Sequence, residues 1–314
     1  MQPDELERVA ARHVPGTGNL DIQLSGKGLI NETYRVLRDG GAYALRVPAA
    51  NPIDLGVDRA WEARVLECAG RADLAPALEY CDPQRGIQIV QWLDGRSWSP
   101  ADVRRESNLA RMAQLVRRVH ALPMPTPARL MSPSTWVDHY SVAQLRATAE
   151  LRTTTELRTT TEPRTTADLP LMAALRHASA QRLAALAALP RVEPVVCHSD
   201  LHTLNLIDRG PALALLDWEY AHVSDPLWDL AGWSANNDLE DEFKHELLMR
   251  YMGRTPARDE YLRLQLLGWL YDYVCLLWSE LYMNPRRDVR PADAVRDGVS
   301  ARAKLLAARL TAAK

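Results

Sequence analysis

Residues 198–205 read HSDLHTLN, and the chemistry of this stretch decides how the rest of the chain is interpreted. Its alternating His198, Asp200 and His202 would share one face of a strand, as metal ligands can. No HExxH motif and no cysteine ligand accompanies them, and Asn205 would have no role in such a site. A zinc site therefore explains little of the stretch.

A phosphoryl-transfer site explains more than either a zinc site or a nucleophilic serine. Ser199 lacks the glycines of the G-x-S-x-G turn that a serine nucleophile needs. Phosphoryl transfer needs a carboxylate that accepts the hydroxyl proton, a metal-binding amide a few residues later, and a second carboxylate that holds Mg²⁺. Asp200 and Asn205 have the first spacing, and Asp217 follows a strand predicted at 212–216. The strand–loop–strand order would bring Asn205 and Asp217 to one cation.

The composition excludes several other classes of protein. The chain has 314 residues, 47% of them hydrophobic and 25% charged, which allows two lobes with a sizeable core. Its 38 Lys and Arg against 40 Asp and Glu create no field that would attract nucleic acid or an anionic membrane. The four cysteines are dispersed, so neither a disulfide framework nor a zinc site is expected.

Two segments of the sequence predict the cellular location of the protein. The N-terminus has no apolar signal-peptide segment, and Asp272 interrupts the most apolar stretch, 264–277. We therefore expect a cytoplasmic protein without membrane or nucleic-acid partners. Its oligomeric state is left open.

The hydrophobic pattern predicts an α+β chain with two unequal lobes. Residues 1–93 are expected to form a small antiparallel sheet with one main helix, and residues 94–314 a larger, mostly helical lobe. The strands expected in the first lobe are 21–25, 31–37, 42–47 and 87–93, beside a helix at 59–68. The second lobe is expected to have helices at 103–122, 171–189 and from 227 onward, with strands at 194–197 and 212–216. The tandem repeat ELRTTT ELRTTT EPRTTA, residues 150–167, is expected to be an insertion, either irregular or a helical extension.

HSDLHTLNLI followed by LLDWEYA resembles the aminoglycoside phosphotransferase superfamily. The DWEYA form favours its choline/ethanolamine kinase and thiamine kinase branch, and the resemblance covers most of the chain outside the repeat. It implies a bilobal, protein-kinase-like fold that uses ATP and Mg²⁺ to phosphorylate the hydroxyl of a small molecule. In that fold Asp200 would be the catalytic carboxylate, and Asn205 and Asp217 the metal ligands.

The segment LSGKGLINETYRV, residues 24–36, resembles the phosphate loop of this family. Small residues let backbone N–H groups approach phosphate oxygens. Ser25, Gly26 and Asn31 are therefore expected to cover the nucleotide.

The resemblance also assigns four further nucleotide-binding residues. Arg46 lies where protein kinases carry the lysine that pairs with phosphates, and choline-kinase-like proteins often have arginine there. Glu62 is its expected partner on the following helix. Gln91 and Leu93 end the last strand of the first lobe, where backbone groups of the hinge would meet adenine.

Two further residues near the loop are expected to be structural. Asp229 would anchor the catalytic loop, and His198 would brace its backbone beside the metal-binding strand. His202 receives no role.

Aromatic side chains in GWLYDYVCLLWSELY, residues 268–282, suggest how an acceptor is held. Aromatic faces attract quaternary ammonium groups, although a stripe at helical spacing also suits core packing. In the resemblance, Trp278 matches a tryptophan of the choline-kinase cation cage, and Cys275 replaces a neighbouring one. Trp278, and Glu219 of DWEYA, are expected to contact the acceptor.

The sequence therefore supports three functions to different degrees. The leading hypothesis is an ATP- and Mg²⁺-dependent kinase of a small cationic alcohol such as choline, ethanolamine or thiamine. An aminoglycoside or other sugar kinase would require clustered carboxylates instead. A nucleotide-binding pseudokinase acting as a regulatory module is the alternative outside enzymes, and the intact Asp200, Asn205 and Asp217 argue against it.

Overall fold

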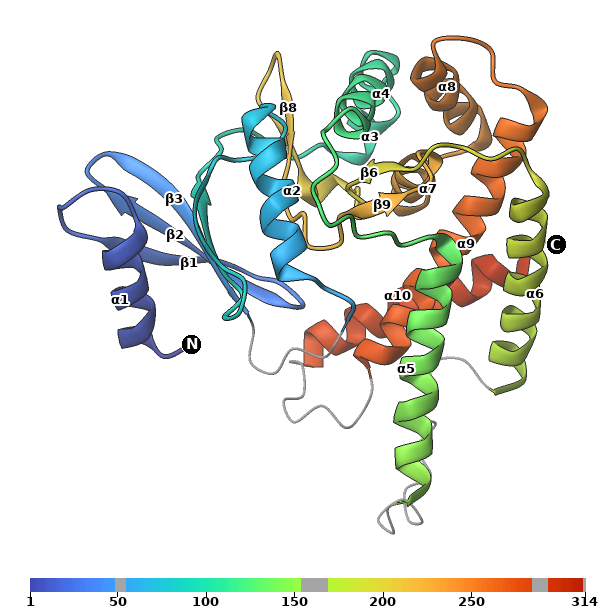
Figure 1. The fold of residues 1–314 in the computed structure, drawn as a ribbon, viewed down its shortest axis with the longest axis horizontal. Coiled ribbons are helices and arrows are strands. Elements are labelled where there is room, and N and C mark those ends of the chain that lie inside the picture. Colours follow the sequence, from blue (N-terminus) through green and yellow to red (C-terminus); the bar gives the residue numbers. More distant parts are fainter. Residues whose placement is uncertain (49–54, 154–168, 284–292, 313–314) are drawn as a thin grey trace.

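The computed structural model describes residues 1–48, 55–153, 169–283 and 293–312. Figure 1 shows a sheet beside the N-terminus that joins a larger group of helices. The expected α+β class, with a small antiparallel sheet and a mostly helical second part, is confirmed. The division of the chain at residue 93 stays a prediction.

Five antiparallel strands form the N-terminal sheet in the order β1-β2-β3-β5-β4. They are β1 Asp21–Lys27, β2 Asn31–Arg38, β3 Gly41–Pro48, β4 Leu78–Asp82 and β5 Ile87–Gln91. The turn between β2 and β3 is formed by Asp39 and Gly40, whose φ angles are +50° and +79°. Two left-handed residues match the twist of a two-residue hairpin, as the Asp-Gly-Gly sequence predicts.

The sheet is covered by two helices, α1 Pro3–His13 and α2 Arg59–Arg71. Leu6 and Val9 of α1 pack against Val36, Leu45 and Ile89 of the strands. Figure 1 shows α2 between the sheet and the helical part. Buried side chains of α2 belong to the core that continues into the helical part, so the two parts share apolar contacts.

Three details of the N-terminal part differ from the sequence prediction. Strand β1 continues to Lys27 because a register shift between Leu24 and Gly26 lets the pairing with β2 proceed. The turn is therefore limited to residues 28–30. Helix α1 and strand β4 were not predicted; β4 reads LEYCD, in which acidic and apolar residues mix without a clear alternation.

The helical part is organised around α9 Arg258–Tyr282, which packs against α5, α6, α7 and α10. The other helices are α3 Pro100–Val103, α4 Glu106–His120, α5 Pro133–Thr153, α6 Leu169–Ala188, α7 Leu227–Asn236, α8 Asp241–Met252 and α10 Asp293–Ala312. The helix expected at 103–122 is α4, and the short α3 ahead of it, which a capping box of Ser99 and Asp102 begins, was not predicted.

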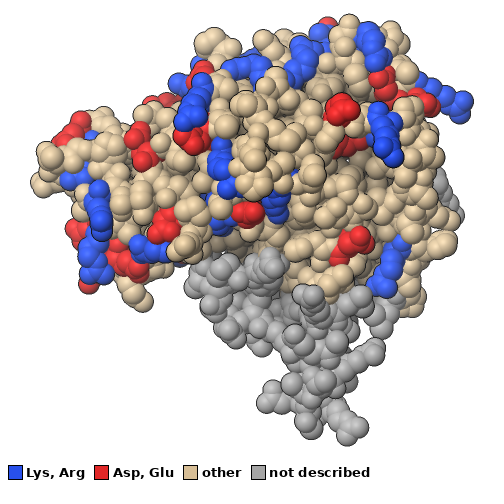
Figure 2. Space-filling view, in the orientation of Figure 1, with Lys and Arg blue, Asp and Glu red and all other residues tan. Residues whose placement is uncertain are grey.

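Helix α5 contains the first four residues of the threonine repeat, and the remainder, 154–167, lies outside the described residues. Within the described ranges no helix is long and apolar enough to cross a membrane. Figure 2 shows basic and acidic side chains interspersed over the face that it presents, which matches the balanced charge of the chain.

Short strands hold the HSDLHTLN loop. β6 Val195–Cys197 precedes it and pairs with β9 His222–Ser224, while β7 Leu206–Asp208 follows it and pairs with β8 Leu213–Leu215. The loop ends in a single 3₁₀ turn, η2 Thr203–Asn205. The N–H of Leu216 donates to the carbonyl of Asn205 at 2.8 Å. The β7–β8 hairpin therefore presents Asn205 and Asp217 side by side.

Candidate active site

A cavity of about 780 Å³ lies between the sheet and the helical part. It brings together most of the residues predicted for the site: Gly26, Asn31, Arg46, Asp200, Asn205, Asp217, Glu219 and Trp278. The cavity also includes Lys27, Gly28, Leu29 and Ile30, which the sequence analysis did not single out. These residues line the cavity because β1 continues to Lys27, so the loop between β1 and β2 begins two residues later than predicted.

Four predicted residues do not line this cavity. Ser25 lies on the exposed part of β1, ahead of the loop tip. Glu62 lies behind Arg46 instead of facing the cavity. Gln91 is the last residue of β5 and Leu93 lies in the connection after it, and the Gln91 side chain donates outward to Glu79 at 2.9 Å.

Arg46 on β3 joins the sheet to Asp217, which follows β8. One guanidinium nitrogen lies 2.5 Å from Glu62 Oε1, and another lies 2.9 Å from Asp217 Oδ1. Burial would lower the pKa of Arg46, but Glu62, Asp217 and Glu219 raise it above its ordinary value. The arginine is thus held charged and oriented, with its partner Glu62 on α2 as the sequence suggested.

Arg59 is a second cation of the site that the sequence analysis missed. Its guanidinium donates to Glu62 at 3.0 Å, to Glu219 at 2.8 Å and to the Asn31 side-chain oxygen at 2.8 Å. Asn31 in turn donates to Glu219 at 2.7 Å. Arg59 and Glu62 are three residues apart on one helix, and that i,i+3 pair was the available signal. Through these contacts α2 ties the phosphate loop to the DWEYA segment.

Two neighbouring carboxylates of this cluster resist ionisation. Burial and the charge of Asp217 raise the pKa of Glu219 to about 7. Burial also raises the pKa of Asp217, against the opposing effect of Arg46. Asp217 has a φ of +58°, a left-handed backbone that is uncommon outside glycine. A bound cation would relieve the repulsion between the two carboxylates.

The donor atoms at this end of the cavity fit Mg²⁺. The Asn205 Nδ2 group donates to the Asp200 carbonyl at 3.0 Å and to Asp200 Oδ2 at 3.1 Å, so Oδ1 is the atom of this amide that could bind a cation. Together with the Asp217 carboxylate it provides the hard oxygen ligands that Mg²⁺ prefers.

The described residues contain one cluster of three His, Cys, Asp or Glu side chains whose ligand atoms all lie within 4.8 Å of one another, and it consists of His120, Cys197 and Asp229. The zinc arrangement of His198, Asp200 and His202 is therefore not formed.

Asp200 lies at the cavity with its side chain 30% exposed. Burial disfavours its charged form, but His202, His198 and Arg302 outweigh this effect and lower the pKa of Asp200. The carboxylate is therefore ionised at neutral pH. His202, which had no assigned role, caps η2 by accepting from the Leu204 N–H at 3.2 Å and places its Nε2 3.5 Å from Asp200.

Two buried side chains brace the loop from behind. His198 donates through Nε2 to the Leu216 carbonyl at 2.8 Å and accepts the Asp200 N–H through Nδ1 at 3.3 Å, as a neutral imidazole does. Burial lowers the pKa of His198. Asp229 accepts the N–H groups of His198 at 2.9 Å and Ser199 at 2.7 Å. These contacts confirm the structural roles predicted for His198 and Asp229.

The end of the cavity beside Asp200 has aromatic walls. Trp278 donates through its indole N–H to the Tyr220 hydroxyl at 2.8 Å and stacks on Tyr282 at 5.0 Å and 12°. Trp136 and Tyr140 of α5 form a second stacked pair at 5.4 Å. Tyr220, Trp136 and Tyr140 were not singled out from the sequence because they lie outside helix α9, which carries Trp278 and Tyr282.

Comparison with known proteins agrees with this geometry. The phosphotransferase enzyme family matches residues 21–267. A solved choline/ethanolamine kinase family protein from Mesorhizobium loti is 26% identical with a TM-score of 0.70, covering 98% of this chain and 95% of that one. Protein LicA of Haemophilus influenzae is 22% identical over 261 residues, 81% of this chain and 71% of LicA. Thiamine kinase of Escherichia coli O81 (strain ED1a) is 34% identical over 83 residues, 26% of this chain and 27% of that protein.

The family match extends over both the sheet that carries Arg46 and the hairpin that carries Asn205 and Asp217. The fold is that of the protein-kinase-like phosphotransferases, as the sequence predicted. The chain belongs to the phosphotransferase enzyme family and is a small-molecule kinase.

Proposed function

We propose that this kinase transfers the γ-phosphoryl group of ATP, with Mg²⁺, to the hydroxyl of a small cationic alcohol such as choline, ethanolamine or thiamine. The observation that carries the proposal is the aromatic wall beside Asp200, formed by Trp278, Tyr220, Trp136 and Tyr140. The names of the relatives, LicA, thiamine kinase and a choline/ethanolamine kinase family protein, support the same class of acceptor.

The proposed reaction gives each of these cavity residues a separate role. Asp200 orients the acceptor hydroxyl and accepts its proton as the bond from the hydroxyl oxygen to the γ-phosphorus forms and the bond from that phosphorus to ADP breaks. Asn205 and Asp217 would hold Mg²⁺, which would neutralise charge on the phosphates. Arg46 pairs with the phosphates, and Gly26 lets the loop backbone approach them.

The hinge would contact adenine through fewer groups than the sequence suggested. The N–H groups of Gln91 and Trp92 already donate to the carbonyls of Ala77 and Ala42, each at 2.9 Å. They are therefore not available to a nucleotide. Among the hinge N–H groups, that of Leu93 is therefore the one proposed to contact adenine.

A sugar kinase of the aminoglycoside type is less well supported by the same cavity. Polyamine acceptors need several carboxylates, and among the described lining residues the acids are Asp200, Asp217 and Glu219. Glu219 is already paired with Arg59, and Asp217 with Arg46. No carboxylate cluster is left for amino groups, whereas aromatic faces can hold one quaternary or primary ammonium.

The proposal is tested by measuring ADP release with a panel of acceptors. Choline, ethanolamine and thiamine are compared with aminoglycosides, amino sugars and dimethylbutanol, the neutral carbon isostere of choline. We expect a cationic alcohol to have the highest kcat/KM. The neutral isostere should be about tenfold poorer, because the ring faces stabilise a cation by roughly 1–2 kcal/mol. Preference for an aminoglycoside would reject the proposal, and MgATP binding without turnover of any acceptor would favour a pseudokinase.

Replacing Trp278 should weaken acceptor binding specifically. Trp278→Leu keeps an apolar side chain but removes the ring face, so KM for the cationic acceptor should rise about tenfold while KM for ATP stays constant. Trp269→Leu on the same helix is the matched control, because Trp269 is buried away from this cavity. The measurement is steady-state kinetics of both variants and the parent enzyme. If the acceptor KM of Trp278→Leu equals that of Trp269→Leu, Trp278 contributes only to core packing and not to acceptor binding.

A further inference from the structure

The β7–β8 hairpin is attached to the connection between the two parts of the molecule and also to the segment that follows α2 in the N-terminal part. The Arg96 N–H donates to the Asp208 carbonyl at 3.1 Å, and the Asp208 N–H donates to the Arg96 carbonyl at 2.8 Å. On the other strand, the Leu215 N–H donates to the carbonyl of Leu74, just after α2, at 2.7 Å. The element that carries Asn205 and Asp217 is thus fixed to the chain on either side of the hinge.

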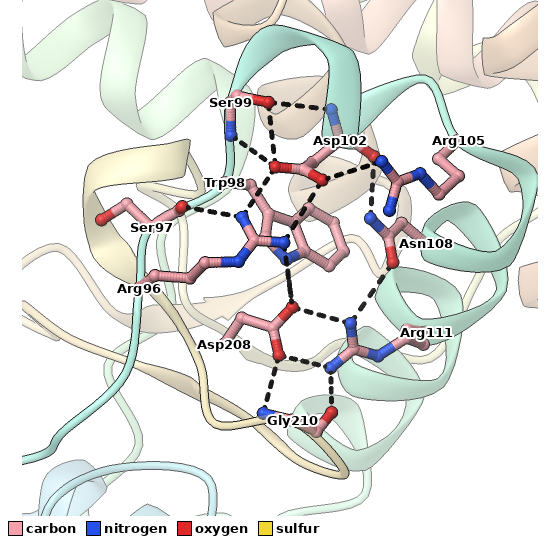
Figure 3. A network of polar contacts seen from close by, with 10 residues as sticks. All are labelled: Arg96, Ser97, Trp98, Ser99, Asp102, Arg105, Asn108, Arg111, Asp208 and Gly210. Carbon is pink, nitrogen blue, oxygen red and sulfur yellow. Dashed lines mark hydrogen bonds and ion pairs between the residues drawn. The ribbon is translucent and has the colours of Figure 1, made fainter.

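A side-chain cluster reinforces the first of these attachments (Figure 3). Asp208 accepts two hydrogen bonds from Arg111 at 2.8 and 2.7 Å and one from the Trp98 indole at 2.8 Å. The Arg96 guanidinium lies 2.7 Å from Asp102 and 3.9 Å from Asp208. We call Arg96, Trp98, Asp102, Asp208 and Arg111 the hinge clasp.

The clasp is built tightly around a buried charge. The side chain of Asp208 is 8% exposed. Hydrogen bonds from Arg111 hold its pKa well below the usual range, so it is a carboxylate at any physiological pH. A Cβ atom on Gly95 would lie 2.5 Å from Ile207 Cγ2 and 2.7 Å from the Asp208 carbonyl oxygen, so the hinge segment approaches β7 as closely as glycine allows.

The position of the clasp links it to the metal-binding end of the cavity. Asp208 does not line the cavity, yet it lies three residues after Asn205 on the strand that fixes the Asn205 backbone. A shift of β7 would move the Asn205 amide relative to Asp217 and to the hinge. Partners that orient a metal ligand typically change metal affinity 10- to 100-fold when they are lost.

We propose that Asp208, held by Arg111 and Arg96, is a positioning residue that sets the metal-binding geometry of Asn205 relative to the nucleotide hinge. The proposal rests on the assignment of Asn205 as a metal ligand in the proposed function. It does not depend on which alcohol is phosphorylated.

Asp208→Asn tests the proposal, because it keeps the shape of the side chain and removes its charge. Calorimetric titration of ATP with and without Mg²⁺ is the main measurement. We expect affinity for MgATP to fall about tenfold, with Mg²⁺-free ATP affinity unchanged. The Mg²⁺ concentration for half-maximal turnover should rise by a similar factor, with acceptor KM unchanged. Arg111→Lys, which keeps the charge but loses the two-pronged contact, should show a smaller effect of the same kind.

Arg263→Lys is the matched control. Arg263 forms a buried ion pair with Asp225 in the helical part, with both side chains 9% exposed. It should lower the melting temperature without changing the Mg²⁺ response. If Asp208→Asn and Arg111→Lys lower the melting temperature alone, with Mg²⁺ dependence like that of the parent protein, the clasp is only structural and the proposal is wrong. The binding measurement needs no acceptor, so a wrong choice of alcohol would leave its result intact.

Discussion

Asp200→Asn is expected to lower kcat about 10³-fold, with KM for ATP changed less than threefold. General-base assistance by a positioned carboxylate contributes about 10²- to 10⁴-fold to a rate. The pKa of Asp200 is held below its usual value, so the parent enzyme keeps the carboxylate ionised at neutral pH. The asparagine preserves the shape of the side chain but cannot accept the hydroxyl proton.

The measurement is steady-state turnover with the best acceptor of the panel, beside a binding titration with MgATP. Unchanged nucleotide affinity would show that the cavity is intact. Asp241→Asn is a suitable control, because its side chain is 74% exposed on α8. An Asp200→Asn enzyme that kept a third of the parent rate would rule out proton acceptance by Asp200.

The catalytic segment could be predicted from sequence because its parts are close along the chain. A short hairpin of fixed length separates Asn205 from Asp217, so spacing alone indicates that they meet. The same holds for Asp229, whose carboxylate reaches back to a loop only 30 residues earlier. Periodicity predicted the strands that border this segment, since few alternative pairings exist for them.

Contacts between distant segments could not be predicted in the same way. Arg59 meets Glu219 across 160 residues, and Trp278 meets Tyr220 from another element. How a helix packs against a segment far away in the sequence depends on the packing of the whole core, and a single sequence does not specify it. Ser25 shows a smaller limit: a bulge in β1 moved the loop tip away from it, and the neighbouring Gly26, which can mark such a bulge, was interpreted as part of the loop.

The largest effect on stability is expected at Asp229. Asp229→Ala removes a fully buried carboxylate that accepts the backbone N–H groups of His198 and Ser199 and contacts His120 at 3.1 Å. Two buried N–H groups would lose their partner, and each such loss costs about 1–3 kcal/mol. We expect the free energy of unfolding to fall by about 3–5 kcal/mol, as when one partner of a buried charge network is removed.

Chemical denaturation of Asp229→Ala beside the control Asp241→Ala separates this effect from a general loss of charge. Asp241 pairs with Lys244, but its side chain is 74% exposed, so its removal should cost less than about 1 kcal/mol. The Asp229→Ala molecules that remain folded should also have a lower kcat. The reason is that Asp229 holds Ser199, the residue directly before Asp200, in a strained backbone conformation with a φ of +70°. Unchanged stability would mean that the loop is held by β6 and β7 alone. Normal turnover in a destabilised protein would show instead that Asp200 keeps its orientation without the anchor.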